Sequence, residues 1–491
     1  MEISAGTIVS FVLYMVGMLG IGFYFYDRKS DVEKYLLGGR GLGSWVTAMS
    51  AQASDMSGWL MMGLPGSIYA AGSGDTWCAI GLAIGTFFNW WLVAPRLRVY
   101  TEITDSMTVS TFFGMRFKDP TNLLRVISAL VILLFFSIYV GSGLVAAGKL
   151  FESMFNINYV LAVAIGALAV LIYTLCGGFL AVCYTDLVQG ILMFFAIVMI
   201  PSLAVMKLAD GSIAANMEAR NLSLALFPET MNFKAFLAII SAAVWGLGYF
   251  GQPHIIVRFM GIDNHKSLRK SMIIAMIWVV ISLACAVWIG AVAIGMYPDL
   301  PASEHERVFI KMIVDTCNPW IGGIFLSAIM AAIMSTIDSQ LLSASSALAQ
   351  DCYKLIFRKN AGEREMLNAN RGFVVLIMVF ATVLALADLQ TIFKIVQFAW
   401  GGFGSAFGPV VLMALYSRKT SWQSALVGMI TGTIVMLAWK FSPWGAYMYE
   451  ILPGFLANLV VILALNNVFP QQDEEVLAQF DKMTAIIKGH E

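Results

Sequence analysis

The stretch Ala51-Gln52-Ala53-Ser54-Asp55-Met56-Ser57-Gly58 lies inside a hydrophobic run, residues 45–69, that is long enough to cross a membrane. A carboxylate and hydroxyls at that depth cost several kcal/mol unless they have partners. Because glycine weakens a helix and serine competes for its hydrogen bonds, we predict that this helix is broken near Ser57 and Gly58. A break frees carbonyl and amide groups, which is tolerated in mid-membrane only where they line a cavity within the protein.

The freed backbone groups predict a site for charged ligands. Carbonyl oxygens suit a small hard cation, and the N-terminus of a half-helix suits a carboxylate. A plainer alternative is a buried Asp55 that a neighbouring helix satisfies, with the Ser-Gly pair acting only as a packing kink. Charged groups inside membranes are costly and mark function by default, so we favour the functional interpretation.

The composition places the chain in a membrane. Of its 491 residues 59% are hydrophobic and only 12% are charged, whereas about 25% charged is usual in soluble proteins. The formal net charge is zero, which gives no basic face for nucleic acid. The six cysteines lack the spacing of a zinc site or a disulfide framework. We find no nucleophile–base pair, phosphate loop or redox-ligand set, so we do not expect an enzyme.

Apolar segments of about 20 residues predict an all-α polytopic protein with about thirteen membrane spans. They cover residues 4–26, 45–69, 77–95, 126–150, 159–180, 187–206, 233–253, 271–296, 319–345, 372–389, 392–416, 423–440 and 449–468. We expect one transmembrane domain over residues 1–468, with its core at about 45–416, and a short cytosolic tail over 469–491.

The distribution of Lys and Arg predicts the orientation of these spans. Twenty-two of the 30 lie in the loops and tail on one side. Cytoplasmic loops are enriched in Lys and Arg, so the N-terminus is expected outside and the C-terminus in the cytoplasm of a bacterial inner membrane.

A second polar group of residues lies in the span at 319–345. Ala332, Ser335 and Thr336 share one helix face because they are three and four residues apart. One carbonyl and two hydroxyls could supply half or more of a sodium shell. Alternatively, the hydroxyls bond back to carbonyls one turn earlier and serve helix packing. The density of polar residues here, with Asp338 and Ser339 directly following, favours function.

Asp186 lies near a predicted membrane boundary, shortly after Gly177 and Gly178. Two glycines allow a tight turn and a close approach of helices. The simplest role of Asp186 is to cap the helix that starts at about residue 187. A role in cation binding or gating is the alternative.

Two further segments carry large rings beside glycines. From Trp245 to Tyr249 aromatic and glycine residues alternate, and Pro253 ends or bends that helix. Such rings could face a cavity, or they could form an aromatic belt at the membrane interface. Tyr139 lies in mid-span beside a serine flanked by glycines, which we interpret as a buried hydroxyl over a glycine hinge.

At these positions the sequence resembles the sodium:solute symporter family, and most of all its bacterial members that carry proline. The resemblance runs from Tyr35 to about residue 465, and it includes the motifs Ala53–Trp59, Gly177–Asp186, Trp245–His254 and Met334–Thr336. It implies a leucine-transporter-like fold with two inverted five-helix repeats, here spans 2–6 and 7–11. One extra helix precedes the repeats and two follow.

The resemblance also implies which residues bind the ligands. It assigns Na+, the coupling ion, to the carbonyls of Ala53 and Met56 together with Ala332, Ser335 and Thr336, and it implicates Asp55 in sodium affinity. It assigns L-proline to a pocket formed by Ser57, Gly58, Tyr139, Trp245, Tyr249 and Pro253.

Asp338 departs from the proline-carrying members, which often have serine at this position. Ser335, Asp338 and Ser339 share a helix face, and some family members build a second sodium site there with the residue that matches Asp186. A second sodium site or a gate at Asp186, Asp338 and Ser339 is therefore a hypothesis for this chain.

The residues and the resemblance together predict sodium-coupled uptake of L-proline by alternating access. One alternative is a symporter for another small carboxylated solute. Another is a transporter-like membrane sensor, although a tail of about 23 residues is too short for a signalling domain. A channel would need a polar pore along its full depth. The expected partners are the solute, sodium and the lipid bilayer, without nucleic acid or an obligate protein partner.

Overall fold

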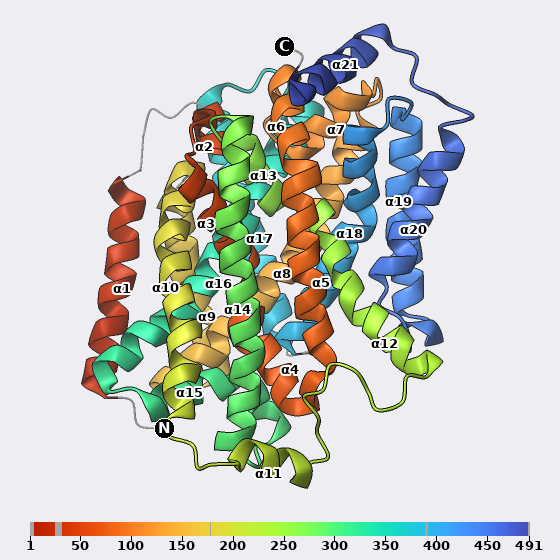
Figure 1. The fold of residues 1–491 in the computed structure, drawn as a ribbon. Helices are drawn as coiled ribbons and strands as arrows, with labels where there is room; N and C mark the ends of the chain where they lie inside the picture. The colour runs from red at the N-terminus through yellow and green to blue at the C-terminus, as the bar shows by residue number, and fades with distance from the viewer. Residues whose placement is uncertain (1–3, 25–31, 177, 388–390, 490–491) are drawn as a thin grey trace.

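The computed structural model describes residues 4–24, 32–176, 178–387 and 391–489, and over these ranges the chain is helical without a β-sheet (Figure 1). The longer helices are α1 (Ala5–Tyr24), α3 (Ser44–Asp55), α5 (Thr76–Phe88), α6 (Ala94–Ile103), α8 (Leu123–Phe155), α9 (Tyr159–Cys176), α10 (Phe179–Val205), α12 (Phe233–Ala243), α14 (Leu268–Met296), α16 (Pro319–Ala347), α17 (Glu363–Leu386), α18 (Ile392–Tyr416), α19 (Trp422–Lys440), α20 (Ile451–Leu465) and α21 (Glu474–Lys488). The shorter helices are α2 (Val32–Leu37), α4 (Leu64–Ala71), α7 (Val109–Phe117), α11 (Ser212–Ala219), α13 (Pro253–Gly261) and α15 (Val308–Thr316).

Each predicted span contains helix in the described part of the chain. Ten helical stretches there are long and apolar enough to cross a membrane, and α9 and α20 are shorter apolar helices. Helices prevail because lipid offers no partner for backbone polar groups, so each segment must satisfy its own. Residues 25–26, 177 and 388–389 of the predicted spans lie outside the described residues.

The loops that were predicted to share one side lie at one end of the helix bundle. Helices α2, α6, α7 and α13 lie at the end where α21 crosses the molecule, and α11 marks the opposite end (Figure 1). We call these the α21 end and the α11 end. Contacts between chain segments support this grouping: Leu42 pairs with Ile262, and Lys118 and Arg418 form ion pairs with Glu475 and Asp481 of α21.

The span at 45–69 is broken, as predicted. Helix α3 ends at Asp55, and a π-helical turn, η2 (Trp59–Gly63), then leads into α4. The span at 233–253 is also broken, but our prediction for its end was wrong. A 3₁₀ segment, η5 (Val244–Gly251), leads to an extended Gln252, and a second half-helix, α13, follows where a loop was expected. Proline starts a helix as readily as it ends one, and here Pro253 starts it.

Two other local predictions were wrong. Asp186 does not cap a helix, because α10 begins at Phe179 and places Asp186 two turns inside it. The serine–glycine segment after Tyr139 is no hinge, because α8 continues as a helix from Leu123 to Phe155. Its glycines serve packing instead: a Cβ on Gly143 would lie 2.8 Å from the Ile337 side chain.

Glycines bring α5 and η5 together at backbone distance. A Cβ built on Gly85 would lie 2.2 Å from the Gly246 carbonyl oxygen, and one on Gly81 would lie 2.0 Å from that of Ala243. Small residues are common at helix contacts in membranes because van der Waals packing, rather than a hydrophobic driving force, holds such helices together. The broken span at 233–253 is thereby held tightly against α5.

We expect Gly85→Ala to lower the melting temperature of the detergent-solubilised protein by several degrees, because overpacking costs about 1–3 kcal/mol. Gly17→Ala in α1 is the matched control, since nothing lies within 4 Å of a Cβ at that position. Equal melting temperatures for the two variants, measured by differential scanning fluorimetry, would contradict the close packing of α5 on η5.

Candidate functional site

The break between α3 and η2 forms where the sequence supplies serine and glycine. Met56 leaves the helical conformation at φ −86° and ψ 76°, and the Ser57 N–H bonds to the Asp55 carbonyl. The Ser57 hydroxyl accepts a hydrogen bond from the Trp59 N–H at 3.3 Å and so caps the turn that follows. Gly58 packs on α8, where a Cβ would lie 2.6 Å from that of Ala146. All five residues from Asp55 to Trp59 are buried.

Oxygen atoms from α3 and α16 converge beside this break. The Ser335 hydroxyl donates to the Ala53 carbonyl at 2.7 Å, and the Thr336 hydroxyl lies 3.5 Å from the same oxygen. Both hydroxyls also reach the Ala332 carbonyl, at 3.3 and 3.1 Å. The predicted face of α16 therefore meets Ala53, and its hydroxyls bond back along α16 as well.

This oxygen cluster fits a small alkali cation. Two carbonyls and two hydroxyls are hard neutral ligands of the kind that such cations prefer. The C-terminal end of α3, which carries a partial negative charge, points at the cluster. Met56 lies at the break itself and is fully buried.

Asp55 is the centre of a second cluster on the other side of the break. Its Oδ2 accepts a hydrogen bond from the Tyr249 hydroxyl at 2.5 Å, and its backbone carbonyl accepts from the Trp59 indole at 3.1 Å and the Tyr139 hydroxyl at 3.4 Å. Its Oδ1 is buried without a protein hydrogen-bond partner among the described residues. Rings from η2, α8 and η5 thus surround one carboxylate.

Aromatic rings enclose this carboxylate toward the α11 end. The Trp245 ring stacks on Trp59 with centroids 6.2 Å apart and meets Phe393 edge-on at 4.9 Å. The Tyr249 ring lies edge-on against Trp400 at 5.1 Å. Because Trp245 and Tyr249 are 2% and 0% exposed, the alternative of an interfacial aromatic belt is wrong. Pro253 lies at the start of α13 and lines a small cavity.

A model of the sodium:solute symporter family matches residues 35–432 of this sequence. This chain belongs to the sodium:solute symporter family. It is 43% identical to the sodium/proline symporter of Haemophilus influenzae, over 97% of each chain. It is 44% identical to that of Escherichia coli K12, over 95% of this chain and 94% of the relative.

A solved structure supports the fold of this symporter. A Na+-coupled sialic acid symporter in a substrate-bound, outward-open state superposes with a TM-score of 0.78 at 19% identity, covering 96% of this chain and 100% of that one. The all-α fold is leucine-transporter-like, as the resemblance implied. Among the described residues the two broken helices meet where Tyr249 bonds Asp55 and Trp245 stacks on Trp59.

The symporter also contains a buried ion pair between α10 and α13. Asp186 Oδ2 accepts hydrogen bonds from Ser50 at 2.6 Å and Ser54 at 3.2 Å, and Arg258 Nη2 lies 3.3 Å away. Arg258 also donates to the Ser339 hydroxyl at 2.5 Å, and Ser339 lies 3.0 Å from Ser54. All these side chains are 1% exposed or less. The network joins both broken helices to α10 and α16.

Asp338 joins this network only through its neighbour. The Ser339 hydroxyl lies 3.3 Å from Asp338 Oδ1, and Asp338 Oδ2 has no protein partner in the described part of the chain. The predicted trio of Asp186, Asp338 and Ser339 is therefore brought together, with the Arg258 guanidinium as the cation among them. Sequence reasoning missed Arg258 because we assigned it to a loop. A proline five residues earlier was the available signal that a new helix begins there.

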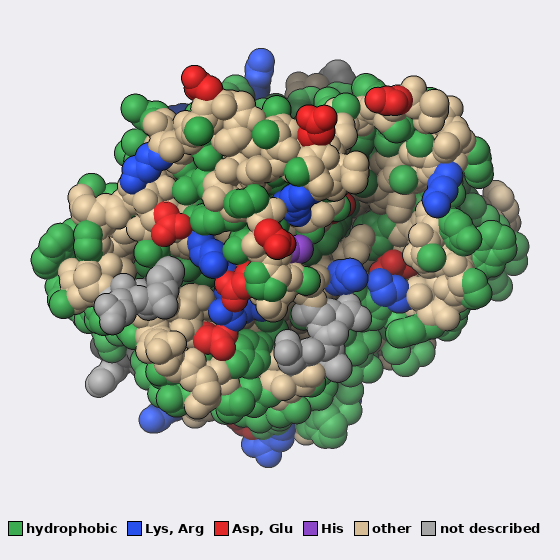
Figure 2. Space-filling model, turned by 90° about the horizontal axis from the view of Figure 1, so that it is seen from below, with side chains coloured by type: hydrophobic (Ala, Val, Ile, Leu, Met, Phe, Trp, Pro, Cys, Tyr) green, Lys and Arg blue, Asp and Glu red, His purple; other side chains and the backbone are tan. Residues whose placement is uncertain are grey.

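A cavity of about 640 Å³ opens at the α11 end, and Lys149, Glu306 and Phe393 are among its lining residues. Figure 2 looks onto this face, where acidic and basic side chains gather around the hollow. In its wall Glu306 bonds Lys149 at 2.5 Å and accepts the backbone N–H of Phe393 at 3.2 Å. Phe393, Trp245 and Trp59 then separate the cavity from Asp55.

We expect Arg258→Ala to destabilise the symporter strongly, because removing one partner of a buried ion pair costs about 3–5 kcal/mol. Adding Asp186→Asn to that variant removes the stranded charge and should restore part of the lost stability. Melting temperatures of the two single variants and the double variant in detergent test this. If the double variant loses as much melting temperature as the two single variants together, Arg258 and Asp186 do not act as a pair.

Proposed function

We propose that this chain carries L-proline into the cell together with Na+ by alternating access. The observation that carries the proposal is the position of the oxygen cluster on α3 and α16, directly beside the aromatic enclosure around Asp55. Two relatives that match nearly the whole chain at 43–44% identity are sodium/proline symporters, which supports the same cargo here.

In this proposal sodium binds between α16 and the broken end of α3. Its ligands are the carbonyls of Ala53, Met56 and Ala332 and the hydroxyls of Ser335 and Thr336. Asp55 supplies a nearby negative charge from the same broken helix. The hydroxyl–carbonyl distances of 2.7–3.5 Å support this set, because small movements can turn these oxygens onto one ion.

Proline binds next to the sodium site. The break at Ser57 and Gly58 receives its carboxylate, since a half-helix N-terminus favours an anion. Tyr139, Trp245 and Tyr249 enclose the ring, and Pro253 closes the pocket toward the α21 end. A compact imino acid suits an enclosure of this kind, which is made of large rings and small residues.

Coupling follows from the shared helix break. When sodium binds, it orders α3 against α16 and so also fixes the neighbouring solute pocket. Each ligand must then raise the protein's affinity for the other ligand by the same factor. One positive charge crossing about 100 mV contributes about 2.3 kcal/mol. At about 1.4 kcal/mol per decade this supports a ~50-fold solute gradient, before the sodium gradient adds to it.

The orientation is part of the proposal. The α21 end faces the cytoplasm of the inner membrane and the α11 end faces outward, because basic loops gather at the α21 end. The cavity beside Glu306 is then the outer entrance. Residues 1–468 form one transport domain with its core at about 45–416, and residues 469–491 form a cytosolic tail.

Uptake of labelled L-proline into proteoliposomes tests the function. We expect accumulation that requires an inward sodium gradient and that rises with an inside-negative potential. A panel of unlabelled amino acids shows whether another small carboxylated solute competes better. Uptake that is indifferent to sodium would contradict the proposal.

Thr336→Ala should raise the sodium concentration for half-maximal uptake about tenfold, because one ligand of the ion is lost. Ser202→Ala removes an exposed hydroxyl and is the control. Unchanged sodium dependence in Thr336→Ala would contradict the sodium assignment.

Tyr249→Ala should chiefly raise the proline concentration for half-maximal uptake, because the pocket loses a wall and Asp55 loses its donor. Tyr447→Ala, at an exposed tyrosine, is the matched control. A wild-type half-saturation value for proline in Tyr249→Ala would exclude this residue from the pocket.

A second sodium site at Asp186, Asp338 and Ser339 predicts two sodium ions per solute. Asp338→Asn should then reduce the ratio to one, because the site loses its second carboxylate. Parallel fluxes of labelled sodium and proline measure the ratio. A ratio of one in the wild type that is unchanged in Asp338→Asn would remove the second site.

A further inference from the structure

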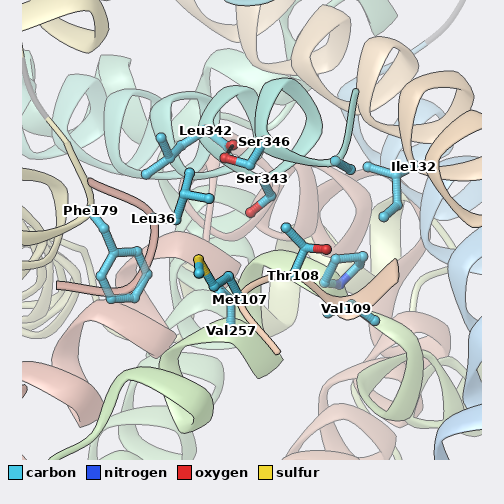
Figure 3. Close-up of a pocket in the computed structure, with 12 residues that line it drawn as sticks. Leu36, Met107, Thr108, Val109, Ile132, Phe179, Val257, Leu342, Ser343 and Ser346 are labelled. Carbon is cyan, nitrogen blue, oxygen red and sulfur yellow. Dashed lines mark hydrogen bonds between the residues drawn. The ribbon is translucent and has the colours of Figure 1, made fainter. Parts of the chain in front are cut away.

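A second, smaller cavity lies toward the α21 end from the proposed solute pocket. It has about 30 Å³ of free volume, and Pro253, Ile132 and Thr108 are among its lining residues (Figure 3). The same helices line both spaces: α8 passes from Tyr139 to Ile132, and α13 passes from Pro253 to Val257. The small cavity is therefore the next space along the solute's route inward.

His254 lies on the boundary between these two spaces. It follows Pro253 in the first turn of α13 and is 0% exposed. Its ring meets Phe136 at 5.3 Å and Tyr139 at 6.0 Å, both nearly edge-on. These two rings lie about one turn apart on α8, and the Tyr139 hydroxyl reaches the Asp55 carbonyl. On the other side Pro253, the residue before His254, lines the small cavity.

Neither ring nitrogen of His254 has a protein hydrogen-bond partner among the described residues. An imidazole always offers at least one N–H donor, and burying it without a partner is unfavourable. A phenylalanine would fill the same aromatic niche without that cost. The His254 imidazole is therefore a polar group without a protein partner, and it lies between the proposed solute pocket and the small cavity.

Polar groups continue from His254 into the small cavity. Ser343 on α16 and Thr108 at the start of α7 both line it (Figure 3). The Thr108 hydroxyl donates to the Asp351 carboxylate at 2.8 Å, so Ser343 supplies the hydroxyl donor for a ligand. The N-terminal end of α13 carries a partial positive charge at the same place. Donors and a positive helix end complement a carboxylate, whereas an apolar ring gains nothing from them.

We propose that His254 guides the carboxylate of the transported solute from the central pocket into this cavity during inward release. This inference rests on the proposed function, and it gives His254 a role in movement rather than in resting affinity. As α13 shifts and the central pocket opens, the imidazole N–H takes over the carboxylate. The Ser343 hydroxyl then receives it.

The test separates binding from release. In His254→Phe, sodium-dependent binding of labelled proline to the detergent-solubilised protein should stay within about twofold of the wild type. Net uptake into proteoliposomes should fall about tenfold, the factor expected for one lost hydrogen bond to a charged group. His254→Gln keeps a donor and should recover most of the uptake.

His265→Phe is the matched control, because His265 lies in the loop before α14 and outside both cavities; it should leave binding and uptake unchanged. Wild-type uptake in His254→Phe would overturn the proposal. So would a parallel loss of binding and uptake in His254→Phe and His254→Gln, since His254 would then hold the resting site together. If the wild type binds no proline, it is the proposed function that fails.

Discussion

The contact between the Ala53 carbonyl and the hydroxyls of Ser335 and Thr336 is the interaction on which the rest of this structure depends. A helix end inside a membrane leaves carbonyls that lipid cannot satisfy. Helix α16 satisfies them with side chains on one face, and so makes the break tolerable. In the proposed function the same oxygens bind sodium, and the chain beyond the break holds the solute. One solution to a backbone problem would therefore position both ligands.

Much of this site could be predicted from the sequence, because the signals are local. Ser57 and Gly58 weaken a helix wherever they occur, and the spacing of Ala332, Ser335 and Thr336 fixes a common face. The second break was harder, because Pro253 fits the end of one helix and the start of another equally well. That ambiguity hid α13 and, with it, the buried Arg258. Glu306 pairs with Lys149 and Phe393, which lie far from it in the chain, so no local sequence pattern predicts these contacts.

The described residues form a series of layers between the α11 end and the α21 end. A wide cavity with charged walls comes first, and the rings of Phe393, Trp245 and Trp59 separate it from the ligand sites. The layer beyond Asp55 contains His254 and leads to the small cavity. The two barriers differ in chemistry. The first is aromatic throughout, whereas the second combines rings with an unpaired imidazole.

The glycine contacts have a mechanical consequence. Gly85 and Gly246 hold α5 close against η5. Gly290 allows a similar approach of α14 to α4, because a Cβ built on Gly290 would lie 2.8 Å from the Pro65 carbonyl oxygen. Parts of both broken helices are thereby joined to neighbours with little room to slide, whereas Ser335 and Thr336 belong to α16 outside these contacts. In the proposed function the coordination shell of sodium is divided between α16 and the broken helix that contains Ala53 and Met56. The affinity for sodium would then depend on the distance between these two helices, so a lipid or a distant substitution that displaces one of them would change the sodium requirement without touching a ligand.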